Sequence, residues 1–153
     1  MLRQLHPLAG LAGFLTLLGF WISTVLVELF GSHELIVTVK QAIPWGLIVL
    51  IPALALTGAS GFSLAGTRSG TRIDGKRRRM LVIAGIGLLV LTPSAFYLSA
   101  GTPFTTTFSL VQAIELLAGA VSLTLMAMSV RDGFKLSGRF HAKTAEAKRW
   151  RTP

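Results

Sequence analysis

Cysteine is absent from the sequence, and acidic residues are few: six Asp and Glu stand against fifteen Lys and Arg, for a formal net charge of +9. The missing cysteine excludes disulfides, thiolate metal ligands and a cysteine nucleophile. Charged residues make up only 14% of the chain and hydrophobic residues 52%, whereas ordinary soluble domains carry about 25% charged residues. This balance indicates a membrane protein. The basic residues are then better explained as signals that set the orientation of the chain in the membrane than as contacts with nucleic acid.

The sequence contains none of the motifs H-E-x-x-H, G-x-S-x-G, G-x-x-x-x-G-K-[ST] or G-x-G-x-x-G, which mark common zinc, hydrolase and nucleotide sites. We therefore predict no catalytic residues, no metal site and no required cofactor. His6 and His33 would lie about 40 Å apart along one helix, and His141 lies in a polar C-terminal segment. The histidines do not favour haem binding, whereas quinone binding remains open.

Four apolar segments are long enough to cross a bilayer as helices, because a bilayer core needs about 20 mostly apolar residues. They cover approximately residues 8–30, 42–66, 80–101 and 104–130. None shows the alternating pattern of barrel strands, and lipid tolerates no unpaired backbone groups. The sequence therefore predicts an all-α fold, an integral membrane four-helix bundle in one domain, followed by a basic tail over residues 131–153.

Basic residues are distributed unevenly between the two ends of the predicted bundle. Fourteen of the fifteen lie at Arg3, in residues 67–79 and in residues 131–153, and the remaining one is Lys40. These three segments fall on one side of a four-span topology, which the positive-inside rule identifies as cytoplasmic. We therefore expect both termini in the cytoplasm.

A run of four cations, Lys76, Arg77, Arg78 and Arg79, directly precedes the third predicted span. Cations at this position can contact the head groups of anionic lipids on the cytoplasmic leaflet. They can equally act only as a stop on translocation. The sequence leaves both interpretations open.

The acidic residue Glu115 lies near the middle of the apolar run SLVQAIELLAGAVSL. By helical rise it falls about 16 Å below the outer surface, and one residue from each other span lies at a similar depth, so that all four are about 12 to 16 Å deep. We therefore predict a small polar pocket within the membrane. Its candidate residues are Glu115, Gln112, Trp21, Pro52, Pro93 and Tyr97.

The role of this pocket has three alternatives. Because no cation lies within the predicted spans, we expect Glu115 to be neutral and hydrogen-bonded. It then either holds the helices together, or binds a quinone, lipid or small ligand, or moves protons or ions. Glu28 and Lys40 flank the short loop between the first two spans, and we predict that they form a structural ion pair there.

Several segments resemble a group of small four-span bacterial membrane proteins of uncharacterised function. They are HPLAGLAGF, FWISTVLVELFG, VKQAIPWGLIVLIPALALTGASGF, KRRRM, ELLAGAVSLTLM and RDG, spread over about the first 138 residues. The resemblance implies a multi-pass protein of the bacterial cytoplasmic, or inner, membrane. It implies no activity.

The sequence favours an integral membrane binding or accessory subunit of a larger membrane assembly. Its partners would be the lipid bilayer and either further copies of the chain or another membrane protein, because small residues recur at positions that allow helices to approach closely. A small proton-coupled carrier that uses Glu115 is the alternative. A quinone- or haem-binding redox protein is the third.

The topology can be tested by labelling single cysteines, since the chain contains none of its own. In intact cells, a membrane-impermeant thiol reagent should label Ser32→Cys and leave Ser69→Cys and Thr144→Cys unlabelled, because only the first lies outside. Labelling of Ser69→Cys before lysis would reverse the predicted orientation.

Overall fold

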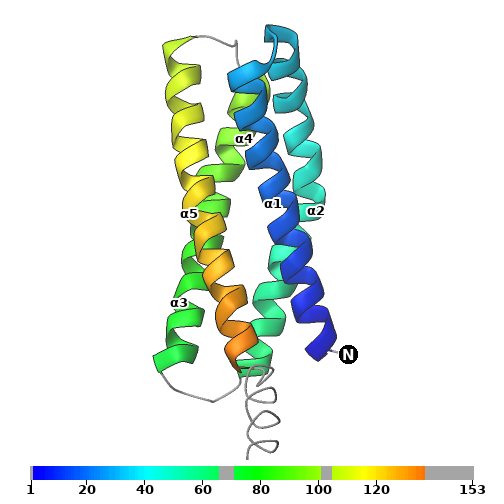
Figure 1. Ribbon diagram of the computed structural model, residues 1–153, viewed down its shortest axis with the longest axis vertical. Helices are drawn as coiled ribbons and strands as arrows, with labels where there is room; N and C mark the ends of the chain where they lie inside the picture. The colour runs from blue at the N-terminus through cyan, green and yellow to red at the C-terminus, as the bar shows by residue number, and fades with distance from the viewer. Residues whose placement is uncertain (1, 66–70, 101–104, 137–153) are drawn as a thin grey trace, which may run out of the picture.

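The computed structural model describes residues 2–65, 71–100 and 105–136, and these residues are almost entirely helical. Their elements in order are α1 (Leu2–Phe30), α2 (His33–Ala65), α3 (Thr71–Ile86), the π-helical turn η1 (Gly87–Leu91), α4 (Thr92–Ala100) and α5 (Thr106–Leu136). Because α3, η1 and α4 follow one another without a break, the described residues form four long rods (Figure 1). The structure confirms the predicted all-α four-helix bundle.

The connection between α1 and α2 consists of Gly31 and Ser32. Gly31 closes α1, because its amide donates to the carbonyl of Val27 at 2.8 Å and a Cβ there would lie 2.5 Å from the same oxygen. Ser32 caps α2 by accepting from the amide of Leu35 at 3.4 Å. A two-residue connection makes α1 and α2 antiparallel neighbours.

The four rods run side by side along the long axis of the bundle (Figure 1). Among the described residues, α1 packs against α2 and α5, α2 also packs against α3 and α4, and α5 also packs against α3, η1 and α4. Within that part of the chain α2 and α5 have no direct backbone contact, so they lie diagonally across the bundle. Any interaction between them must pass through its centre.

The turn η1 ends at Leu91, two residues before Pro93. Proline cannot donate a backbone hydrogen bond, and its ring collides with the carbonyl four residues earlier. The chain widens here, so that both the amide and the hydroxyl of Thr92 donate to the carbonyl of Gly87. This bulge joins α3 to α4.

Four helices are long and apolar enough to cross a membrane: His6–Phe30, His33–Gly61, Arg77–Ala100 and Thr106–Asp132. Large apolar side chains on their outer faces are exposed, including Leu15, Ile48, Leu89 and Leu117. The chain therefore has the architecture of a multi-pass membrane protein. The second span begins at residue 33 rather than at the predicted 42, and residues 137–153 of the predicted tail lie outside the described residues.

Candidate functional site

A buried ion pair joins the two helices that lie diagonally across the bundle. Lys40 Nζ on α2 donates to Glu115 Oε2 on α5 at 2.5 Å. Only 2% of the Lys40 side chain and 12% of the Glu115 side chain are exposed. The pair therefore lies in the centre of the bundle, away from the lipid-facing surface.

Lys40 points inward because of its position on α2. Its buried face consists of Ile36, Lys40, Ile43, Leu47 and Leu50. These residues follow one another in steps of four and three, the spacing of a single inward face on a helix packed in a bundle. Because the four apolar residues of this face are packed in the core, Lys40 is buried with them.

Glu115 belongs to the inner face of α5, together with Gln112, Gly119 and Ser122. Lys40 is seven residues from the start of α2 and Glu115 is nine from the start of α5, which places them about 10 Å and 14 Å along their helices.

Removing the two charges from water costs on the order of several kcal/mol each, and their close approach offsets this cost.

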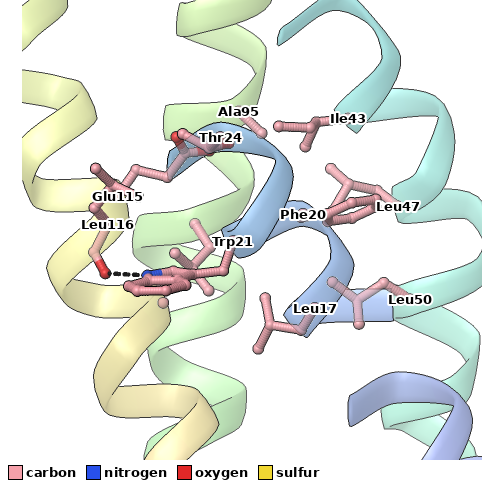
Figure 2. A pocket seen from close by; sticks show the side chains of 12 residues that line it. Leu17, Phe20, Trp21, Thr24, Ile43, Leu47, Leu50, Ala95, Glu115 and Leu116 are labelled. Atoms are coloured by element: carbon pink, nitrogen blue, oxygen red, sulfur yellow. Dashed lines mark hydrogen bonds between the residues drawn. The ribbon is translucent and has the colours of Figure 1, made fainter. Parts of the chain in front are cut away.

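Trp21 fixes the contact between α1 and α5 directly beside the ion pair. Its indole Nε1 donates to the carbonyl of Leu116 at 3.0 Å (Figure 2). A Cβ at Gly119 would lie 2.9 Å from Trp21 Cδ1, so glycine leaves room for the ring. Trp21 is near Glu115, as the sequence predicts, but it donates to the backbone of α5 and not to the carboxylate.

A small, mainly apolar cavity extends from Glu115 into the core. Its volume is about 40 Å³, and Figure 2 shows side chains from α1, α2, α4 and α5 around it. The lining includes Leu17, Phe20, Trp21, Thr24, Leu47, Leu50 and Ala95. Such a volume holds a water molecule or two, whereas small-molecule sites usually measure about 300 to 1,000 Å³. This geometry does not favour a quinone or haem inside the bundle.

The predicted ion pair between Glu28 and Lys40 is wrong, because Lys40 pairs with Glu115. The prediction placed Lys40 in a loop, whereas α2 begins at His33 and includes it. Glu28 is exposed at the end of α1. The premise that no cation lies within the spans fails for the same reason, because the second span includes Lys40.

Three other predicted pocket residues do not face Glu115. Pro52, Pro93 and Tyr97 are exposed on the outer surface of the bundle. Pro52 also lies deeper than predicted, because α2 begins at His33 rather than at residue 42, and this puts Pro52 19 residues, or about 28 Å, from that end of the helix. Gln112 is buried with 6% exposure and lines a different pocket, between α1 and α5.

The cations of the basic run before the third span differ in their surroundings. Arg79 forms an ion pair with Asp132 on α5, with Nη2 and Oδ2 2.6 Å apart, and its Nε donates to the carbonyl of Gly75. Arg77 and Arg78 are exposed, and the side chain of Lys76 lies outside the described part. Arg79 therefore joins α3 to α5 instead of being directed to lipid alone.

His6 belongs to a polar contact at the opposite end of the bundle. Its Nδ1 lies 3.0 Å from Ser60 Oγ and 3.1 Å from the carbonyl of Thr57. His33 begins α2 at the other end. Within residues 2–65, 71–100 and 105–136, no group of three His, Cys, Asp or Glu side chains could hold a metal ion.

The ion pair makes a specific prediction for stability. Lys40→Met and Glu115→Leu should each lower the free energy of unfolding by about 3 to 5 kcal/mol, because each leaves one buried charge without its partner. The double variant should recover most of this loss, since an apolar pair of similar volume replaces the ions. Unfolding of the purified bundle in mixed micelles measures all three.

Glu34→Gln is the matched control, because Glu34 is exposed in the first turn of α2. Its effect should stay within about 0.5 kcal/mol. Single variants as stable as the native protein would show that the pair is not formed in the membrane-like environment.

None of the protein-family models, curated proteins or solved structures compared with this chain matches it. The observations that bear on function are therefore those of the chain itself. They are a central ion pair, a small cavity beside it and the outer surfaces of four apolar helices.

Proposed function

We propose that this chain is an integral membrane binding or accessory subunit of a larger membrane assembly, in a bacterial cytoplasmic membrane and with both termini in the cytoplasm. An accessory subunit acts through its outer surface. The observation that carries the proposal is a group of small residues on the outside of α2. We call Ala55, Gly58 and Ala59 the outer stripe of α2.

The outer stripe of α2 is not covered by the chain's own helices. Ala55 and Ala59 are exposed, and a Cβ added at Gly58 would meet nothing within 4 Å. Small residues four apart let a second helix approach closely, and van der Waals packing then drives association in lipid. The outer stripe therefore suits contact with a helix of another subunit.

Other small residues of the chain have a different explanation, because they accommodate contacts within the bundle. A Cβ at Gly13 would lie 3.1 Å from Leu54, and one at Gly61 would lie 2.8 Å from Met80. Sequence alone cannot separate such internal contacts from an outer face. The structure assigns Gly13 and Gly61 to the inside and leaves the outer stripe of α2 open.

The small interior supports the same proposal. The cavity beside Glu115 measures about 40 Å³, well below the volume of an ordinary ligand site. A bundle with so little internal space acts more readily through its surface than through a bound substrate. The ion pair then serves to hold the helices in one arrangement.

Replacing the outer stripe should disrupt assembly and spare the fold. We expect Ala55→Leu/Ala59→Leu to remove the chain from its complex, or to shift its oligomers to monomer, because the larger side chains prevent close approach of a second helix. Co-purification in mild detergent, followed by size-exclusion chromatography with light scattering, measures both effects.

Ala127→Leu is the matched control, since it is the same change at an exposed position on α5. It should leave assembly intact, and all variants should melt at similar temperatures. A native chain that purifies as a monomer without partners would contradict the proposal, as would a complex unaffected by the double substitution.

A small proton-coupled carrier is the second candidate, and the Lys40–Glu115 pair is the observation that favours it. Ionisable residues inside a membrane often belong to proton relays. The adjoining cavity touches Glu115 and has room for water. Proton movement needs much less space than transport of a solute.

The carrier is tested by proton flux in liposomes under an imposed pH gradient, read with an internal pH-sensitive dye. The native chain should raise the flux above that of empty liposomes, and Glu115→Gln should abolish the increase. If Glu115→Gln fails to fold, Lys40→Met/Glu115→Leu takes its place. Flux that is unchanged by removal of the carboxylate would eliminate the carrier.

A further inference from the structure

Each of the four rods contributes a buried polar residue to one level of the bundle. Thr24, Lys40 and Ser94 are 2%, 1% and 9% exposed, and 12% of the Glu115 side chain is exposed. They lie six to nine residues from the helix ends that meet where the α1–α2 turn lies (Figure 1), which places them about 9 to 14 Å deep. We call these four residues the polar layer.

Apolar side chains close the bundle on both sides of the polar layer. Ile36, Leu98 and Phe108 form a cluster nearer the helix ends and are 4%, 2% and 4% exposed. They lie two or three residues from those ends, about 3 to 5 Å deep, and we call them the end cluster. Leu47 and Leu50 of the larger core cluster lie on the other side. The polar layer is therefore enclosed.

The cavity beside the ion pair reaches the polar layer at two of its side chains. Glu115 of α5 and Thr24 of α1 both belong to the lining, and Figure 2 shows the Glu115 side chain extending from α5 toward Thr24. The cavity volume is about 40 Å³, whereas one water molecule needs about 10 to 15 Å³ of such volume. The cavity thus has room for water within reach of both side chains.

The Glu115 carboxylate can accept more hydrogen bonds than the one from Lys40. An ionised carboxylate offers about four acceptor positions on its two oxygens. Within the described residues, the hydrogen bond to its side chain is the one from Lys40 Nζ to Oε2. The Thr24 hydroxyl can both donate and accept. A water molecule between them can therefore donate to the carboxylate and hydrogen-bond to the hydroxyl.

The charge in the lining decides whether such a cavity is dry or hydrated. Cavities lined by apolar side chains alone stay dry, and buried water sits where it finds two or more polar partners. Hydrogen bonds to an ionised group are roughly twice as strong as those between neutral groups, and the entropic cost of holding one water is small by comparison. The carboxylate and the hydroxyl together meet this requirement, although the rest of the lining is mainly apolar.

We propose that the cavity beside the ion pair is a binding site for water, in which a bound water donates to the Glu115 carboxylate and hydrogen-bonds to the Thr24 hydroxyl. The end cluster separates this water from the nearer end of the bundle, so the site is an internal one and not part of an open channel. The buried carboxylate then has two partners, the Lys40 ammonium and the water.

Water contacts of individual methyl groups test the site in the full chain, labelled at its methyl groups and dissolved in deuterated detergent. Cross-relaxation with water should be measurable at Leu47 and Ala95, which line the cavity. Ile36 and Leu98 are the internal control, because they lie nearer the bundle end but outside the lining, and they should show none. Absence of contacts at Leu47 and Ala95, or equal contacts at all four residues, would overturn the proposal.

Two variants test the polar partners. Lys40→Met/Glu115→Leu removes the carboxylate and should abolish the water contacts of Ala95, because the lining becomes mainly apolar without a charge. Thr24→Val keeps the shape of the side chain, removes the hydroxyl and should remove most of these contacts. Full contacts in either variant would overturn the proposal.

Thr38→Val is the matched control, since it is the same change at an exposed position of α2 near the same end of the bundle. It should leave the water contacts unchanged. Melting temperatures establish that each variant is folded, and if the double variant fails to fold, Thr24→Val still tests the site.

Xenon separates a hydrated cavity from a dry one, because it binds in dry apolar cavities. Under xenon pressure the methyl chemical shifts of Leu17 and Leu50 should not change in the native chain, although both residues line the cavity. Xenon-dependent shifts at these residues would identify a dry cavity and overturn the proposal. These measurements need neither assembly nor proton flux, so their outcome is independent of both candidate functions.

Discussion

The Lys40–Glu115 pair constrains the rest of the bundle, because it joins charged groups of α2 and α5 across the centre, beside the apolar cluster of Ile36, Leu98 and Phe108. Two buried charges cannot separate without leaving each other unpaired in an apolar core. The rotation of α2 about its axis is therefore set by Lys40, and that of α5 by Glu115. Apolar packing tolerates small rotations of a helix, whereas a single ion pair at the bundle centre selects one arrangement.

The remaining polar contacts near the centre depend on that arrangement. With Glu115 directed inward, Gly119 one turn further along α5 lies against Trp21, and the indole reaches the carbonyl of Leu116. Gln112, three residues before Glu115, then lines the pocket between α1 and α5. The central ion pair and the position of Gln112 are thus consequences of one orientation of α5.

The sequence predicts the helices well and the helix faces less well. Hydropathy and length establish four spans, but the depth of a residue along a helix says nothing of its direction. Pro52 is two residues from buried Leu50, which rotates it by about 200° to the outside. The predicted second span begins at residue 42 and so leaves Lys40 outside it, although Ile36, Ile43 and Leu47 place Lys40 on an inward face and Ser32 marks the helix start. Those two signals together would have located the ion pair on α2.

The division between inside and outside also explains why function has to be sought on the outer surface. The two charged groups at the centre neutralise one another, and the space beside them is small. By contrast, no helix of the described chain covers the outer stripe of α2. Lipid tails can cover its alanines, but a second helix can pack against small residues more closely. The outer stripe is therefore suited to a packed helix of another subunit.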